Sequence, residues 1–185
     1  MTAPVTLDEL MAALPHVLAA PKDRTVVDQL CFRPAYNERR FPDRLTLTRD
    51  QGVPGERWLT APWLKLPDGR PDPDIQVSIL PRRVMDLVWR DREGTPHPGD
   101  TIIADLDTSE ANLPRGTLLR AGTATLRVSG VFNDGCVKWK ARYGADAKAW
   151  IVAEGHPTLR LRGILCAIVE DGEVALCDPI TKIAP

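Results

Sequence analysis

The sequence lacks an excess of charge of either sign. Its 24 Lys and Arg residues stand against 25 Asp and Glu residues, which leaves a formal net charge of -1. A nucleic-acid-binding domain usually carries a clustered basic surplus that neutralises phosphates, and no long basic run marks such a surface here. The charge balance therefore argues against a nucleic-acid partner.

The chain also lacks long apolar runs. No segment reaches the length needed to cross a bilayer, and the first residues show neither the positive region nor the apolar run of a secretory signal. We therefore expect a cytoplasmic protein with no membrane partner. Because cytoplasmic thiols stay reduced, the four cysteines need not form disulfides.

Several motifs that carry chemistry are missing. The cysteines include no Cys-x-x-Cys pair, and His16, His97 and His156 are scattered beside prolines, so zinc is a poor fit. We find no nucleotide-binding glycine loop after a strand, no Gly-x-Ser-x-Gly elbow and no cluster motif for iron and sulfur. The sequence therefore gives no support for a zinc protein, a nucleotide-binding protein of these types or a serine hydrolase.

The residues that are present indicate short strands. The 185 residues, 43% of them hydrophobic, suffice for one well-buried domain that spans residues 1–185. The 13 glycines and 17 prolines indicate many turns. We expect about nine to eleven short strands and three helices, arranged as a largely antiparallel β-barrel with peripheral helices. In this interpretation residues 1–24 are a helical extension and residues 26–183 form the barrel.

Three helices are expected from local signals. A capping box begins one at Thr6, where Glu9 stands three residues on. Pro81 suits the first turn of a second helix. The third runs from about 145 to 154 and ends at Gly155.

The Asp171-Gly172 pair is typical of a two-residue hairpin turn. Four steps along the register of that hairpin, Cys166 would face Cys177 across the strands. We therefore predict that these two thiols are reduced, packed neighbours, with a redox pair as the alternative.

The segment from Gly135 to Tyr143 carries the most distinctive pattern. As an extended strand it would place Cys136, Lys138, Lys140 and Arg142 on one face, because side chains alternate with a period of two. Three cations beside a thiol stabilise the thiolate, which is the form that attacks, carries sulfur or binds metal. The alternative is an ordinary half-exposed strand with a basic outer face and an incidental cysteine.

An ordered set of segments then connects this chain to a known family. They are Gly-Val-Pro-Gly-Glu-Arg-Trp at 52–58, Gln-Val-Ser-Ile at 76–79, Asp-Leu-Asp-Thr-Ser-Glu-Ala-Asn-Leu-Pro at 105–114, Gly-Cys-Val-Lys-Trp-Lys-Ala-Arg-Tyr-Gly at 135–144 and Leu-Arg-Leu-Arg-Gly-Ile at 159–164. From about residue 26 to 183, the chain resembles the MOSC domain family, named for the C-terminal domain of molybdenum cofactor sulfurases. It is most similar to the small, stand-alone bacterial type.

The resemblance implies a MOSC-like β-barrel and a reactive cysteine, which maps onto Cys136. In the family this cysteine is thought to carry sulfur as a persulfide or to ligate molybdenum in the pterin cofactor. The candidate cofactor-binding residues are Arg57, Lys138, Lys140, Arg142, Asn112 and Asn133. Two of these keep other interpretations, because Arg57 can pair with an acidic neighbour and Asn112 can be a turn residue.

Two substitutions depart from the family pattern. Glu56 stands where many members carry Asp, and Asn133 stands where relatives often have His. The first puts the fine geometry of the Arg57 turn in question. The second removes a side chain that could tune the thiol or shuttle protons.

Two activities are consistent with the resemblance: sulfur transfer to molybdenum, or molybdenum ligation in a reductase that acts on a small-molecule substrate. The chain is too short to contain a pyridoxal-phosphate domain, so sulfur transfer needs a separate donor of the cysteine desulfurase type. A reductase needs a separate electron-transfer protein. The alternatives are a non-catalytic barrel that binds a small molecule or senses thiol reagents without molybdenum, and a structural domain with an inert Cys136.

Overall fold

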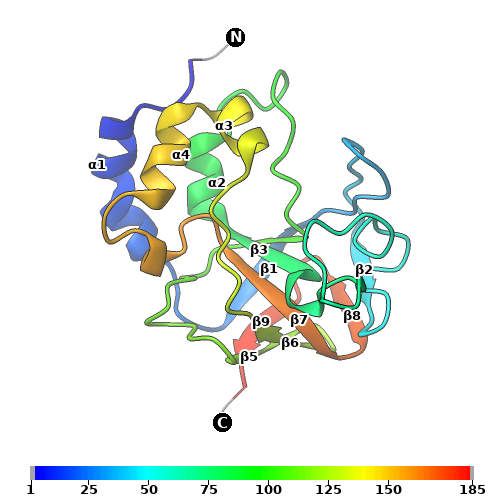
Figure 1. The fold of residues 1–185 in the computed structure, drawn as a ribbon. Coiled ribbons are helices and arrows are strands. Elements are labelled where there is room, and N and C mark those ends of the chain that lie inside the picture. The colour runs from blue at the N-terminus through cyan, green and yellow to red at the C-terminus, as the bar shows by residue number, and fades with distance from the viewer. Residues whose placement is uncertain (1–2, 184–185) are drawn as a thin grey trace.

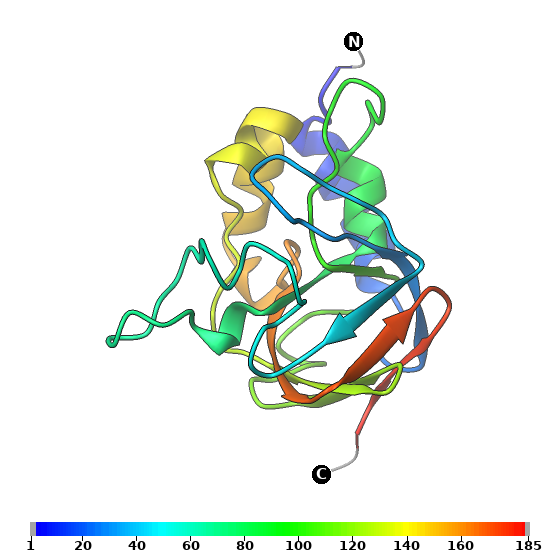
Figure 2. The same cartoon turned by 90° about the vertical axis from the view of Figure 1, so that its right-hand side faces the viewer.

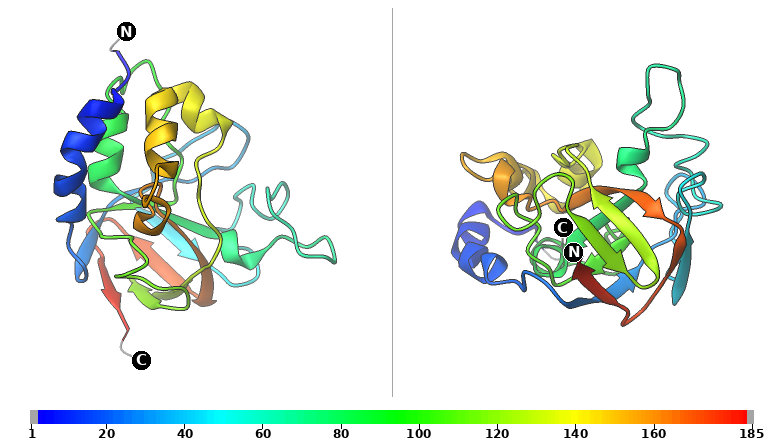
Figure 3. Two further views of the ribbon diagram at one scale, coloured as in Figure 1. Left: turned by 60° about the vertical axis from the view of Figure 1, so that its left-hand side comes forward. Right: turned by 90° about the horizontal axis from the view of Figure 1, so that it is seen from below.

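Seven strands close into a barrel in the computed structural model, which describes residues 3–183 (Figure 1). Hydrogen-bonded neighbours follow the order β1-β4-β3-β7-β6-β5-β9. Their bounds are Thr25–Leu30 for β1, Val77–Pro81 for β3, Ile102–Ala104 for β4, Leu118–Ala121 for β5, Ala124–Val128 for β6, Ile164–Glu170 for β7 and Pro179–Lys182 for β9. Seen from below, these strands surround a common interior (Figure 3, right). The predicted mostly-β barrel is confirmed.

Two more strands, β2 (Arg44–Leu47) and β8 (Gly172–Ala175), form an antiparallel ribbon beside the barrel (Figure 2). Within the barrel, the pairing of β3 with β4 is parallel and the other pairings among the described residues are antiparallel. The prediction of a largely antiparallel barrel therefore holds, with one parallel pair that the sequence pattern did not indicate.

Four α-helices gather at one end of the barrel in the described part of the chain (Figures 1 and 3). Their bounds are Leu7–Leu18 for α1, Arg82–Val88 for α2, Val137–Tyr143 for α3 and Ala145–Val152 for α4. Two short 3-10 turns, η1 (Pro73–Ile75) and η2 (Pro157–Leu159), complete the regular structure. The capping box of α1 is formed, because Thr6 Oγ1 accepts from the Glu9 amide at 3.3 Å and Glu9 Oε2 accepts from the Thr6 amide at 2.8 Å.

Two apolar cores lie on opposite sides of β3 and β4. Ile79 and Ile102 are fully buried in the barrel interior. Their neighbours Leu80 and Ile103 are equally buried, but they pack against the helices. Because successive strand residues point to opposite faces, this wall of the barrel is apolar on both sides and holds the helical layer in place.

The structure corrects the expected strand around Cys136. Residues 137–143 form helix α3, which begins after Gly135 at a φ of +70°. Trp139 and Tyr143, four residues apart, are buried on one face and pack edge to face with ring centroids 4.7 Å apart. Val137, which a strand would have turned inward with them, is 85% exposed. The apolar pattern of this segment is therefore that of a short helix.

The predicted pairing of Cys166 with Cys177 is also wrong. β7 pairs with β3 and β6, so the register places Cys166 opposite Val77 and Val128. Cys166 is fully buried, and burial raises the pKa of its thiol to about 12. Cys177 is exposed and lies beyond β8, which turns away to pair with β2. Both cysteines are free thiols.

Candidate functional site

Two of the predicted cofactor-binding side chains, Lys138 and Arg57, meet around one tyrosine, and the charge of a third, Arg142, also acts on it. Lys138 Nζ lies 3.7 Å from the centre of the Tyr36 ring, and the Arg57 guanidinium carbon lies 5.9 Å from it. A hydrogen bond from Lys138 and the Lys138 charge lower the pKa of the Tyr36 phenol, with smaller contributions from the charges of Arg57 and Arg142. We call Arg57, Lys138 and Arg142 the basic cluster. The basic cluster brings together the 52–58 turn and α3, two segments that are far apart in the chain.

The 52–58 turn is held by groups that do not include the Arg57 side chain. Gly52 adopts a φ of +67°, and a side chain there would meet the Trp58 ring at 2.9 Å, so glycine is required. Trp58 is buried and donates from Nε1 to the Asp72 carbonyl at 3.1 Å. The Arg57 amide donates to the Arg33 carbonyl at 3.1 Å. Trp58 therefore packs as a structural side chain.

Glu56 forms a buried ion pair that does not include Arg57. Its Oε2 lies 2.9 Å from Arg33 Nη2, and its Oε1 accepts from the Arg33 amide at 2.9 Å and from Nε at 3.2 Å. The Glu56 side chain is fully buried. The sequence left open whether Arg57 pairs with an acidic neighbour. The neighbouring Glu56 forms its ion pair with Arg33 instead of Arg57.

The basic cluster has no acidic partner within residues 3–183. The ion pairs of that part of the chain include neither Arg57 nor Lys138 nor Arg142. Three like charges are thus held together without a compensating carboxylate. Such an arrangement favours the binding of an anion.

Cys136 lies directly before α3, as its N-terminal flanking residue, and is exposed. Lys148 Nζ ties down the preceding loop by donating to the Gly135 carbonyl at 2.7 Å, to Asp134 Oδ2 at 3.1 Å and to the Asp134 carbonyl. Asp134, whose carboxylate would disfavour a thiolate at the nearby Cys136, is therefore paired with a lysine. The thiol itself is open to solvent and reagents.

The single basic face predicted for residues 136–142 does not form. Residues two apart in a helix point about 200° from each other, whereas residues four apart share a face. Lys138 and Arg142 accordingly meet at the basic cluster, while Lys140 is exposed elsewhere on α3. Lys140 is therefore not brought to the site.

The two predicted asparagines have different locations. Asn112 Nδ2 donates to the carbonyls of Asp107 at 2.7 Å and Lys22 at 3.0 Å, and its Oδ1 accepts from Lys182 Nζ at 3.0 Å. These contacts make Asn112 a loop-holding residue apart from the basic cluster. Asn133 lies three residues before Cys136 and donates to the Arg162 carbonyl at 3.3 Å, so it anchors the loop that carries the thiol.

A buried polar group next to the basic cluster was not found from the sequence. Arg162 Nη1 donates to Asp100 Oδ1 at 2.8 Å, and its guanidinium carbon lies 4.4 Å from the Trp139 ring centre. His97 Nδ1 accepts from the Gly99 amide at 3.0 Å. These residues come from the 97–100 turn, from α3 and from the segment before β7, and nothing in their local sequence indicates that they meet. They form the floor beneath the 33–40 loop and α3.

The described residues contain no group of three or more His, Cys, Asp and Glu side chains that could hold a metal ion. A metal bound at Cys136 would therefore have to bring most of its ligands with it. Among the helices of residues 3–183, none combines the length and the apolar character that a membrane crossing requires.

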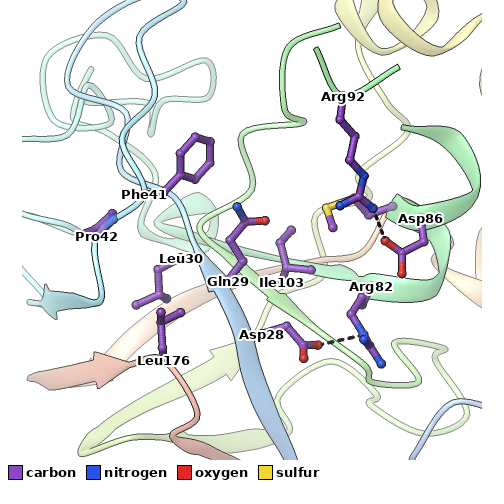
Figure 4. Close-up of a pocket in the computed structure, with 11 residues that line it drawn as sticks. Asp28, Gln29, Leu30, Phe41, Pro42, Arg82, Asp86, Arg92, Ile103 and Leu176 are labelled. Atoms are coloured by element: carbon purple, nitrogen blue, oxygen red, sulfur yellow. Dashed lines mark hydrogen bonds and ion pairs between the residues drawn. The ribbon is translucent and has the colours of Figure 1, made fainter. Parts of the chain in front are cut away.

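A groove of about 500 Å³ lies over β1 and α2 (Figure 4). Its charged side chains pair with one another. Asp28 Oδ2 lies 3.3 Å from Arg82 Nε, and Asp86 Oδ1 lies 2.6 Å from Arg92 Nη2. None of the site residues predicted from the sequence lines this groove. Its size suits a small molecule, but its charges are satisfied internally and the candidate site lies elsewhere.

Fold and site together define a seven-stranded barrel protein with an exposed cysteine at the start of α3 and a basic cluster that has no acidic partner among residues 3–183. No protein-family model and no curated protein matches the chain. Its fold is similar to that of YuaD from Bacillus subtilis, with a TM-score of 0.58, 19% identity, and coverage of 85% of this chain and 94% of YuaD. It is also similar to that of YiiM from Escherichia coli, with a TM-score of 0.54, 20% identity, and coverage of 88% of this chain and 70% of YiiM. At these identities the likeness shows a shared fold.

Proposed function

We propose that this chain is a MOSC-domain protein that binds the molybdenum cofactor. Arg57, Lys138 and Arg142 would hold the phosphate of the pterin, and Cys136 would contact the metal. The sequence resemblance to the MOSC family and the fold shared with YuaD and YiiM support the assignment.

The observation that carries the proposal is the basic cluster without acidic partners. Like charges held together raise the free energy of the folded chain unless an anion offsets them. Arginine and lysine donors form strong charge-assisted hydrogen bonds to phosphate oxygens. The cluster comes from the 52–58 turn and from α3, the two segments that also carry the family resemblance. Lys138 follows Cys136 by two residues, so the proposal requires phosphate and thiol to share the start of α3.

The thiol has the properties that this role requires. A thiolate is a soft ligand suited to molybdenum, and Cys136 is exposed at the start of α3. The cofactor, when bound, would supply two-electron redox chemistry at its metal. The protein's own contribution would be to hold the phosphate with the basic cluster and to present one sulfur ligand from a tethered loop.

The same thiol could instead accept sulfur. Its thiolate would attack the outer sulfur of a persulfide on a separate donor of the cysteine desulfurase type. A new sulfur–sulfur bond would form on Cys136 while the donor's sulfur–sulfur bond breaks and the donor leaves as a thiolate. A reductase role would require an electron-transfer protein in place of the sulfur donor. Both roles need an exposed Cys136.

We predict that Cys136→Ser abolishes molybdenum binding, because a serine hydroxyl is a harder and poorer ligand for this metal. The measurement is the molybdenum and pterin content of protein purified gently from a molybdate-replete host. Cys177→Ser is the matched control, since Cys177 is also exposed but lies outside the site, and this variant should retain the wild-type content. Wild-type protein without molybdenum, or Cys136→Ser protein with a full complement, would contradict the proposal.

The basic cluster makes a separate prediction. The double variant Arg57→Gln and Lys138→Gln removes two of its three cations, and we expect at least about a tenfold weaker retention of the pterin, since each charge-assisted contact contributes roughly 1.5–3 kcal/mol. Arg49→Gln, at an exposed arginine paired with Asp171, is the control. Equal pterin content in the double variant and the control would remove the basic cluster from the site.

Sulfur transfer and metal ligation are separated by mass spectrometry. Wild-type protein is incubated with a cysteine desulfurase and cysteine, and the mass of the Cys136 peptide is measured. An added sulfur atom on Cys136, transferable to a molybdenum protein, favours the carrier role. An unmodified peptide in a protein that holds molybdenum favours the reductase role.

A further inference from the structure

Residues 33–39 form a strap over the site. The strap is pinned at its base, where Phe32 and Arg40 exchange two backbone hydrogen bonds of 2.8 and 2.9 Å. Its tip is a turn in which the Glu38 amide donates to the Ala35 carbonyl at 3.2 Å. Tyr36 at the tip is 66% exposed and touches α3 through Lys138. The strap is thus fixed at both ends and lightly held at its tip.

Arg39 lies on the underside of the strap. Its guanidinium is close to the 97–100 turn, since a side chain added to Gly99 would meet Nε at 3.2 Å. Nη1 donates to the Asn37 carbonyl at 3.3 Å, whereas the buried Nε has no partner in residues 3–183. Burial and the nearby charge of Arg142 lower the pKa of Arg39. No carboxylate of residues 3–183 forms an ion pair with this guanidinium.

The floor beneath the strap has three more buried polar atoms without partners in the described chain: His97 Nε2, Asp100 Oδ2 and Arg162 Nε. Because the Gly99 amide donates to His97 Nδ1, the proton of the neutral ring is on Nε2. Burial lowers the pKa of His97 to about 4, so the ring is neutral near pH 7. Together with Arg39 Nε, the strap and its floor hold three N–H donors and one carboxylate oxygen.

Buried polar atoms without protein partners cost about 1–3 kcal/mol each unless water or a ligand satisfies them. Lifting the strap would let water reach these atoms. A ligand that matched the donors and the acceptor would instead stabilise the closed position. The closed strap is therefore poised between opening and closing on a ligand.

We propose that the strap is a lid that opens to admit a small, singly protonated oxyanion and closes over it through Arg39. The oxygens of such an ion accept from Arg39, Arg162 and His97, and its hydroxyl group donates to Asp100 Oδ2. Guanidinium groups suit oxyanions because their donors match two oxygens at once. Chloride has no hydroxyl for Asp100 and is a weaker match. This site uses residues outside the basic cluster and Cys136, so it goes beyond the proposed cofactor site.

Hydrogen exchange of the full-length protein, measured by mass spectrometry, tests the proposal. The protein is prepared from cells grown without molybdate, and the probe is inorganic phosphate compared with sodium chloride at equal ionic strength. We expect the amides of residues 34–39 to exchange about tenfold more slowly when phosphate is at ten times its dissociation constant. The amides of β7 should be unaffected. Unchanged exchange in the strap overturns the proposal.

Two neighbouring arginines provide matched variants. Arg39→Met removes the partly buried guanidinium but keeps an unbranched side chain, and we expect the slowing by phosphate to disappear. Arg40→Met removes an arginine whose side chain is 65% exposed and paired with Glu38, and it should keep the slowing. Full slowing in Arg39→Met, or loss of slowing in both variants, overturns the role of Arg39. Because the basic cluster contacts Tyr36 of the strap and is proposed to bind phosphate, slowing that persists in Arg39→Met belongs to the basic cluster, whereas slowing lost in Arg39→Met but kept in Arg40→Met belongs to this site.

Discussion

Glu56→Gln is expected to lower the free energy of unfolding by about 3 kcal/mol or more. The substitution leaves the guanidinium of Arg33 without its carboxylate in a site where the Glu56 side chain is fully buried. Removing one member of a buried ion pair costs about 3–5 kcal/mol, and the lower end applies because the Arg33 side chain keeps 27% exposure. The loss is measured by urea unfolding monitored by circular dichroism.

Glu38→Gln is the matched control for this prediction. Glu38 is paired with Arg40 at 2.6 Å, but the two side chains are 42% and 65% exposed, so the loss should stay below about 1 kcal/mol. A loss in Glu56→Gln no larger than that in Glu38→Gln would mean that burial does not strengthen the Glu56 pair. The two variants change the same atoms, and they differ in solvent exposure.

The buried pair also answers the question raised by Glu56 in place of the Asp common in the MOSC family. The longer side chain of Glu56 reaches both the amide and the guanidinium of Arg33. It thereby links the start of the strap to the turn that carries Arg57. In this chain the residue has a structural task, and the geometry around Arg57 is built on it.

The barrel could be predicted because its signals are local. Glycine and proline mark the turns, and alternation marks strands such as β6, where Leu126 and Val128 face the core and Arg127 is exposed. The parallel pair of β3 and β4 could not be predicted, since its register depends on contacts between segments that are distant in the chain. Strands with clean alternation, such as β6, are thus readable from this sequence, whereas strand order is not.

Two local patterns misled the interpretation for different reasons. The 137–143 segment is too short to distinguish a period of two from a period of 3.6, and the helical packing of Trp139 and Tyr143 against α4 decided it. The two-residue hairpin turn predicted at Asp171-Gly172 is also wrong: Gly172 already belongs to β8, which pairs with β2 because the barrel occupies both edges of β7. In both cases tertiary contacts override the local signal.

The candidate site, too, could be predicted from the sequence only in part. Arg57, Lys138 and Arg142 were found because each lies in a segment with a family resemblance, and the structure brings them together around Tyr36. Tyr36 and Arg39 were missed, since they lie in the charged stretch between β1 and β2, which carries no segment of the family resemblance. The concentration of arginines in that stretch was the available signal, but without a partner segment it could not be given a role.

A second large effect is expected at Gly163, where Gly163→Ala should lower the free energy of unfolding by about 4 kcal/mol or more. Gly163 has a φ of +83°, and an added methyl group would lie 2.1 Å from the Ile79 carbonyl oxygen. That oxygen belongs to the backbone of β3, which pairs with β7 at Ile164, so neither side can move without breaking the barrel ladder. The cost therefore combines a strained φ with a collision that a rotamer change cannot relieve.

Gly155→Ala separates these two contributions, because Gly155 has a similar φ of +78° but no atom within 4 Å of the added methyl group. We expect it to cost about 1–2 kcal/mol from backbone strain alone. The difference between the two variants, measured by urea unfolding at one temperature, then reports the collision with Ile79. Equal losses would show that β3 and β7 can separate locally. In that event Arg162, which precedes Gly163 and pairs with Asp100, would be held less firmly than the site requires.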